Sequence, residues 1–208
     1  MQDTFGLRQI WESPILDHWN SVATGMTIEE PEKFLLPRLQ TSLFKHGDTW
    51  NEIELIEFCV APIFTLVDFQ TEYFKMFSER RISAVIGDYE LYGEPDALIA
   101  KGTYTPKIPY FCFNEYKRIE AHKGDVRGQL LAELLAAQTL NHAAAPVYGV
   151  YVVEKDWQCV AFHDNTYCIG ETYVASRLED LLTIVKLLKA LKAILIEIAQ
   201  QDASRVLL

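Results

Sequence analysis

Residues 94–118 read EPDALIAKGTYTPKIPYFCFNEYKR, and this stretch decides the fold class. The segments 94–102 and 108–118 are rich in β-branched and aromatic residues with partial alternation, which predicts two strands. Gly102 to Pro109 has the composition of a turn. Antiparallel strands joined by a short loop place the start of the first strand beside the end of the second. The carboxylate of Asp96 is therefore expected close to Glu115.

The segments on either side supply further strands and helices. Residues 82–93, ISAVIGDYELYG, predict a strand, and PVYGVYVVEKDWQCVAFHDNTYCIG (146–170) predicts two or three more, with turns near Lys155 and Asp164. Helices are predicted from Asn51, which has the side chain of an N-cap, from residue 126, and over 177–201. Strands flanked by helices in this order predict an α/β domain, with a mixed central β-sheet covered by helices.

Length and composition limit the class of protein. The chain has 208 residues, 50% of them hydrophobic, which excludes a disordered chain. We expect a helical or irregular arm over 1–50 and one domain over 51–208. No apolar run approaches the roughly 20 residues of a membrane span. The first residues, MQDTFGLRQIW, lack an apolar signal core, so we expect a cytoplasmic protein that has no membrane partner.

The charge of the chain is acidic, but one segment is basic. Lys and Arg number 19 against 29 Asp and Glu, a formal net charge of −10. This balance argues against nucleic-acid binding by bulk electrostatics. The segment 101–128 is net basic, with Lys101, Lys107, Lys117, Arg118, Lys123 and Arg127. A solvated loop and a phosphate-binding surface would both account for this basic segment.

Two carboxylates and one ammonium group are the candidates for chemistry. Glu115 and Lys117 are two residues apart in a predicted strand, so their side chains point to the same face, which Asp96 is expected to approach. Two carboxylates with room for water commonly hold Mg²⁺. A neighbouring lysine can orient water or stabilise charge on a phosphate. The alternative is a surface ion pair of about 0–1 kcal/mol, although Glu115 follows the apolar residues FCF, where an unpaired carboxylate is costly.

Pro95-Asp96 followed by Glu115-Tyr116-Lys117, between an acidic helix and a helix that contains Gln129, resembles the PD-(D/E)XK, restriction-endonuclease-like, nuclease superfamily. The longer run WNEIELIEFCVAPIF…GQLLAELLAAQTLN…PVYGVYV resembles uncharacterised bacterial members of it. The resemblance covers most of residues 50–200. It implies a restriction-endonuclease-like core and a nuclease that depends on Mg²⁺ or Mn²⁺.

The resemblance also implies roles for individual residues. Asp96 and Glu115 would be metal ligands and Lys117 the catalytic lysine. A Glu of the preceding helix would join the metal site; Glu52, Glu54 and Glu57 compete, and Glu52 is favoured because Asn51-Glu52 resembles the start of that helix in the superfamily. Gln129 would belong to a Gln-x-x-x-Tyr element, from which this chain departs by having Glu133 in place of Tyr.

The expected function is therefore hydrolysis of DNA phosphodiester bonds. Lys101, Lys107, Arg118, Lys123 and Arg127 would contact the nucleic acid beside the catalytic residues. RNA, or a branched or damaged DNA, stays open as the substrate, and so does a homo-oligomer. The rival from another class is a catalytically inactive nuclease-like fold that acts as a protein-interaction or assembly module, which the net charge of −10 favours.

Overall fold

The computed structural model describes residues 2–117 and 125–206, with side chains over 3–117 and 125–202. The helices are α1 (Gln2–Phe5), α2 (Pro14–Thr24), α3 (Glu30–His46), a 3-10 turn (Gly47–Thr49), α4 (Glu52–Leu55), a π-helical turn (Ile56–Val60), α5 (Ala61–Val67), α6 (Val126–Leu140) and α7 (Leu178–Val206). The strands are β1 (Arg8–Gln9), β2 (Lys75–Ser78), β3 (Ile82–Ile86), β4 (Tyr89–Gly93), β5 (Ala97–Lys101), β6 (Lys107–Lys117), β7 (Val147–Val153), β8 (Asp156–His163) and β9 (Thr166–Val174).

Seven strands form one mixed sheet in the order β1-β9-β8-β7-β6-β5-β2. The β5–β6, β7–β8 and β8–β9 pairs are antiparallel, whereas β6 and β7 run parallel. The parallel pair needs a crossover connection, and α6 lies within it. The predicted α/β class with a mixed central sheet flanked by helices is confirmed, including the adjacent β5 and β6.

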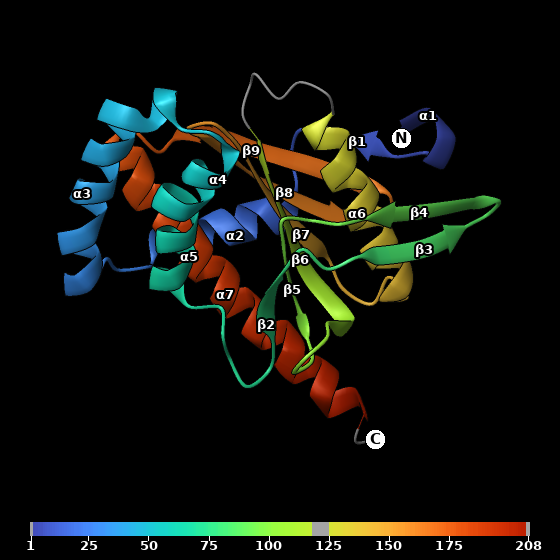
Figure 1. Ribbon diagram of the computed structural model, residues 1–208. Coiled ribbons are helices and arrows are strands. Elements are labelled where there is room, and N and C mark those ends of the chain that lie inside the picture. Colours follow the sequence, from blue (N-terminus) through green and yellow to red (C-terminus); the bar gives the residue numbers. More distant parts are fainter. Residues whose placement is uncertain (1, 118–124, 207–208) are drawn as a thin grey trace.

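Helices cover the two faces of the sheet with separate apolar cores (Figure 1). On one face, residues of α2, α5 and α7 pack on the sheet, as Trp19, Phe64 and Leu188 do. On the other, Leu130 and Leu134 of α6 pack on β6 and β7, and the β3–β4 hairpin covers α6 from outside. A strand covered on both faces has no polar side, which explains the almost unbroken apolar sequence of β7, VYGVYVV.

The segment 82–93 is two strands, so the prediction of one continuous strand is wrong. Ile86 pairs with Tyr89 across a tight turn at Gly87 and Asp88. Gly87 has a φ of +61°, which glycine adopts without the steric cost that other residues bear. The alternation shifts by one residue at this turn, from Ile82, Ala84 and Ile86 to Tyr89 and Leu91, and Gly87-Asp88 is a turn signal that the prediction did not use.

Residues 1–50 are largely helical and pack closely on the rest of the fold. β1 pairs in parallel with β9 and so forms an edge of the main sheet. The Trp19 side chain is fully buried, and its Nε1 donates a hydrogen bond to the Leu187 carbonyl oxygen at 2.8 Å. The buried Glu32 carboxylate lies 3.0 Å from Lys189 Nζ. These contacts fix α2 and α3 against α7.

Helix α7 is the longest element, with 29 residues. It follows the predicted amphipathic pattern, and Leu181, Val185 and Leu188 are buried on the sheet. Lysines interrupt its apolar residues. Within the described part of the chain, no helix combines the length and apolarity needed to cross a membrane.

Removal of the Trp19 side chain tests whether residues 1–50 stabilise the domain. We expect Trp19→Ala to lower the free energy of unfolding by about 3–5 kcal/mol, because it leaves a large cavity between α2 and α7. Trp11, whose side chain is 85% exposed, is the matched control. Trp11→Ala should change the free energy of unfolding by less than about 0.5 kcal/mol. Chemical denaturation measures both, and equal stability of the two variants would contradict the expected role.

Candidate functional site

Asp96 is positioned by the pairing of β5 with β6. Ala97 pairs with Asn114, so Asp96, the residue before β5, lies beside the last residues of β6. Its Oδ2 accepts a hydrogen bond of 2.7 Å from the backbone N–H of Tyr116. The expected approach of Asp96 to Glu115 therefore follows from the register of two strands and one backbone hydrogen bond.

Glu115 is a buried carboxylate on the α6 face of the sheet. The side chains of β6 alternate: Phe113 belongs to the core under α6, and Tyr116 belongs to the opposite core. Glu115 has 0% exposure, and its Oε1 accepts a hydrogen bond of 3.0 Å from Gln129 Nε2 in the first turns of α6. The structure thus brings Gln129 to the candidate site, as the resemblance implied.

Lys117 links Asp96 to Glu52 of α4, in the helical segment that precedes the sheet. Its Nζ lies 3.4 Å from Glu52 Oε1 and 3.9 Å from Asp96 Oδ2, and its side chain is 26% exposed. Glu54 is engaged elsewhere, because its carboxylate accepts the Asn51 N–H in the capping box of α4. Glu52, Glu54 and Glu57 are the candidates for the metal site. Among them, within the described residues, only Glu52 forms an ion pair with Lys117.

Glu133, one turn after Gln129 on α6, adds another carboxyl group to the site. It is 1% exposed and interacts with Glu115. Gly93, the last residue of β4, makes room for it: a Cβ atom on Gly93 would lie 2.6 Å from Glu133 Oε1. In the sequence, Glu133 stands out because it is a carboxyl group inside an Ala/Leu-rich helix. No local sequence pattern predicts its contact with Gly93 of the β3–β4 hairpin.

Burial and mutual repulsion control the charges of the site. Burial, and then the Asp96 charge, raise the pKa of Glu115 to about 7. Burial and the Glu115 charge raise the pKa of Glu133 further. Burial lowers the pKa of Lys117, but the carboxylates of Asp96, Glu52 and Glu115 outweigh it and raise that pKa overall. Lys117 is therefore a cation at neutral pH.

The residues present fit a hard divalent cation. Glu115 Oε2 and both oxygens of Glu133 are buried, and the two carboxyl groups interact with each other and with Gln129. Oxygen-ligating cations such as Mg²⁺ suit such groups. In the described residues, no three His, Cys, Asp or Glu side chains form a group that could hold a metal by themselves. Mg²⁺ is commonly bound by one or two carboxylates, with water and substrate phosphates as its other ligands.

The structure separates part of the basic segment from the carboxylates. Lys101 ends β5 and pairs with Lys107 at the start of β6. Lys101 is five residues after Asp96 along β5, which places it about 17 Å away at about 3.3 Å per residue, and Lys107 lies beside Lys101. The expectation that Lys101 and Lys107 lie beside the catalytic residues is therefore wrong, since a count of charge along the sequence ignores the length of the strand.

Arg127 lies on the first turn of α6, two residues before Gln129. Its Nη2 is 3.2 Å from the hydroxyl oxygen of Tyr151, which pairs with Glu115 across β6 and β7. Its side chain is exposed, so it remains a candidate for phosphate contact near the carboxylates. Arg118 and Lys123, the other predicted nucleic-acid contacts, lie outside the described residues.

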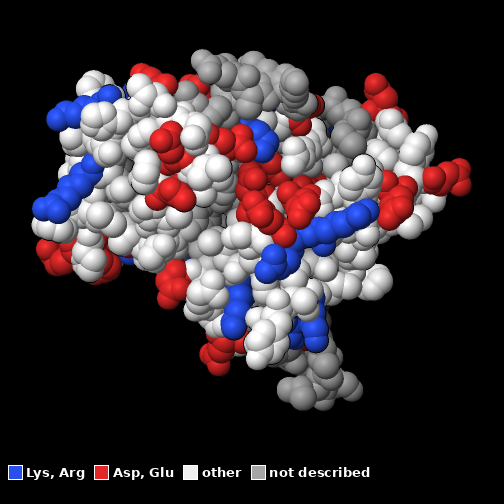
Figure 2. Space-filling view, viewed as in Figure 1, with Lys and Arg blue, Asp and Glu red and all other residues white. Residues whose placement is uncertain are grey.

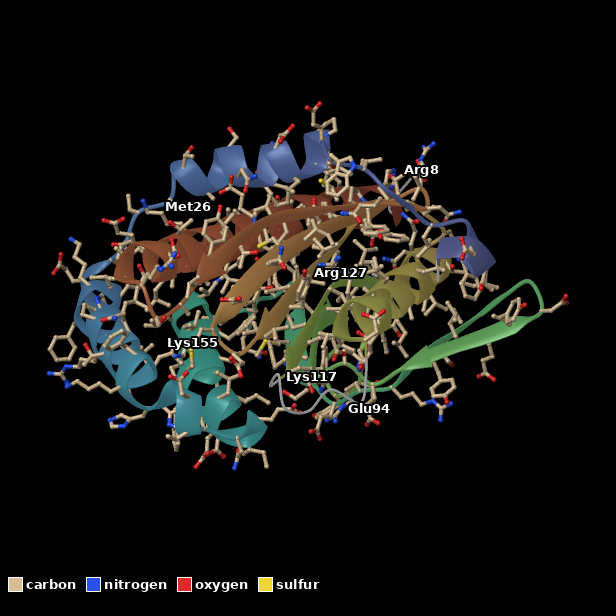
Figure 3. All side chains as sticks on the ribbon, turned by 90° about the horizontal axis from the view of Figure 1, so that it is seen from above. Arg8, Met26, Glu94, Lys117, Arg127 and Lys155 are labelled. Atoms are coloured by element: carbon tan, nitrogen blue, oxygen red, sulfur yellow. The ribbon has the colours of Figure 1, made fainter. Side chains whose placement is uncertain are left out.

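The surface around the site is mixed in charge. Figure 2 shows acidic side chains gathered at the centre of one face, with basic side chains next to them. Figure 3 labels Lys117 and Glu94 in the same region of the molecule and Arg127 apart from them. Two cavities of about 520 Å³ lie at the other end of β5 and β6, where Lys101 and Ile108 line both. Neither cavity is lined by a carboxylate of the candidate site. A nucleic acid that lies across a protein surface needs no such cavity.

Neither a scan against protein-family models nor a search of curated proteins finds a match to this chain. The function is therefore argued from the geometry of the site.

The buried carboxyl groups predict how the stability of the metal-free protein depends on pH. Their pKa values are raised in the folded state, so the folded chain holds protons that the unfolded chain has lost. Stability therefore falls as the pH rises from the ordinary glutamate value of 4.5 through about 7, the value of Glu115, and it continues to fall toward about 10, the value of Glu133. A tenfold difference in proton affinity between the folded and the unfolded chain corresponds to about 1.4 kcal/mol of stability.

Thermal unfolding in EDTA between pH 5 and 8 measures this loss. Glu115→Gln removes the titrating group and keeps the shape of the side chain, so its stability should decline less over the same range. Parallel declines in the two proteins would show that Glu115 does not carry the effect.

Proposed function

We propose that the chain is a metal-dependent nuclease that hydrolyses DNA phosphodiester bonds. The observation that supports this most is the arrangement at the adjoining ends of β5 and β6. There the Asp96 carboxylate accepts the N–H of the residue after Glu115, and Lys117 Nζ lies 3.9 Å from Asp96. This arrangement agrees with the resemblance to the PD-(D/E)XK superfamily and with a restriction-endonuclease-like core.

Asp96 and Glu115 would hold Mg²⁺ or Mn²⁺. When bound, such an ion neutralises phosphate charge and lowers the pKa of a bound water. Gln129 fixes the orientation of Glu115 through the hydrogen bond to Oε1, and the Tyr116 N–H fixes Asp96. Each ligand is therefore held by a second group, which keeps the carboxylates in place before a substrate arrives.

Lys117 acts as a cation in this proposal. In hydrolysis a bond forms between a water oxygen and phosphorus, one phosphorus–oxygen ester bond breaks, and the leaving oxygen gains a proton. The ammonium group of Lys117 can donate hydrogen bonds to the attacking water or to a phosphate oxygen, where negative charge develops. Glu52, 3.4 Å away, holds that ammonium group at the end of β6.

The second candidate function is a protein-interaction module that keeps the fold without catalysis. Exposed apolar side chains favour it: Phe34 and Phe44 on α3, and Ile53 and Phe58 near α4, are all exposed. Exposed apolar surface of this kind is typical of a contact with another macromolecule. A nuclease can also have such a surface, so it does not oppose the first proposal.

Cleavage assays on matched variants test the nuclease. We expect Asp96→Asn and Lys117→Met each to reduce the cleavage rate at least about 100-fold, because each removes charge aimed at the reacting groups. Glu94→Gln, which changes an exposed carboxylate two residues before Asp96, should leave the rate within about twofold. The substrates are linear, circular and single-stranded DNA, and RNA, with Mg²⁺ or Mn²⁺.

Equal cleavage by all four proteins would indicate a contaminant and would remove the support for the catalytic assignment. Absence of cleavage on every substrate would favour the interaction module.

Arg127 provides a separate test of where the nucleic acid lies. We expect Arg127→Glu to weaken DNA binding and to reduce the slope of log affinity against log salt by about one, because one phosphate contact is lost. Lys107→Glu makes the same change of charge at the far end of β6 and should have little effect. Fluorescence anisotropy at several salt concentrations measures both, and a larger effect of Lys107→Glu would move the binding surface to the other end of the strand.

A further inference from the structure

Two adjoining cavities lie at the end of β5 and β6 that is distant from Asp96. Each has a volume of about 520 Å³, which is in the range of cavities that hold a small organic ligand. The last turns of α7 cross this end of the sheet and contribute to both cavities (Figure 1). The residues that line both are Lys101, Ile108, Pro109, Phe111 and Asp202. Because the cavities have these residues in common, one ligand can contact both.

The first cavity is net positive in a protein that is otherwise acidic. Three lysines line it, Lys75, Lys101 and Lys107, against two carboxylates, Glu72 and Asp202. Within the described residues, none of the three lysines forms an ion pair. The whole chain has a formal net charge of −10. A small anion would therefore meet cations here that no neighbouring carboxylate neutralises.

The backbone holds Lys101 and Lys107 together. The two residues pair across β5 and β6, and like charges in such positions destabilise a sheet. The pairing shifts its register next to Lys101, and bulges of this kind are common beside functional sites. The connecting loop folds closely on itself, because a Cβ atom on Gly102 would collide with the Thr105 carbonyl oxygen. An anion between the two ammonium groups would relieve their repulsion.

The second cavity is mainly apolar. Besides the shared residues, its lining includes Tyr110, Ala145, Pro146 and Ile198. Asn141 fixes this wall, because its Oδ1 accepts the Tyr110 N–H at 2.9 Å and its Nδ2 donates to the Tyr110 carbonyl oxygen at 2.6 Å. A preformed apolar cavity with a few charged groups at one side is typical of a site for a small molecule.

We propose that the two cavities form one binding site for a small organic anion that has an apolar ring or chain. Its charged group lies near Lys101 and Lys107, and its apolar part lies beside Ala145 and Ile198. A nucleotide and a fatty acid both have this chemistry. The candidate nuclease site contributes no residue to either cavity, so this inference does not depend on the proposed function.

Two fluorescent probes that differ only in charge test the site. Anilinonaphthalene sulfonate is an anion, and phenylnaphthylamine has the same rings without the sulfonate. The double variant Lys101→Met/Lys107→Met keeps the aliphatic part of both side chains. We expect it to weaken binding of the sulfonate probe at least about tenfold, because interactions with charged groups are lost, and binding of the neutral probe by less than about twofold. Lys45→Met, at an exposed position on α3, is the matched control and should leave both affinities within about twofold.

The apolar half of the site has its own variant. Ala145→Trp fills the second cavity and should weaken the binding of both probes. Chemical denaturation of the double lysine variant shows that a loss of affinity is not a loss of folding. Its free energy of unfolding should equal or exceed that of the wild type, because the repulsion between the lysines is removed. An unchanged affinity for the sulfonate probe in either variant would overturn the site.

Competition identifies the ligand class. AMP and dodecanoate each contain an anionic and an apolar part, and displacement of the sulfonate probe by the stronger of them distinguishes a nucleotide from a fatty acid. Displacement by neither would overturn the proposed ligand class. Double-stranded DNA should not displace the probe at an equal concentration of phosphate. Displacement by DNA would assign the lysines to nucleic-acid binding and would contradict a site for a small anion.

Discussion

The rest of the site depends on one constraint, the burial of the Glu115 carboxylate in the middle layer of the protein. β6 lies between β5 and β7, and helices cover both faces of the sheet, so its side chains have little access to water. A carboxylate there requires polar partners from neighbouring elements. The crossover helix α6 supplies Gln129, while the register of β5 places Asp96 beside the following residue. The β3–β4 hairpin closes the group by packing against Glu133.

This arrangement is unfavourable for stability in the absence of a ligand. Burial raises the pKa values of Asp96, Glu115 and Glu133 together, which means that the folded protein resists their ionisation. Apolar residues at 115 and 133 would suit the surrounding Leu and Phe side chains better. Active sites commonly contain such unfavourable groups because their chemistry requires them. Under the proposed function, these buried carboxyl groups are the ones that a bound cation would stabilise in their ionised form.

Local sequence patterns predict part of this site. The remaining contacts join elements that are far apart in the sequence, and local patterns do not predict them. The alternation in 94–118 predicts β5 and β6, and their antiparallel pairing brings Asp96 to Glu115 as expected. The position of Asn51 before an acidic helical turn predicts the cap that the structure has. The place of Lys107 is predicted wrongly, because Lys107 and Lys117 are at opposite ends of one 11-residue strand. The contact of Gly93 with Glu133 joins two elements whose sequences carry no sign of each other.

The charge of the site links metal binding to substrate binding under the proposed function. Glu52 and Asp96 pair with the ammonium group of Lys117, and Glu115 and Glu133 interact with Asp96, so a fully ionised and metal-free site is strongly negative. It would repel a phosphate backbone, and the net charge of −10 would add to this repulsion. A divalent cation bound there would offset much of this negative charge. Because a cation and a phosphate each weaken the repulsion that the other meets, their affinities must increase together, by reciprocal linkage. An acidic protein can in this way bind nucleic acid at one place while the rest of its surface repels it.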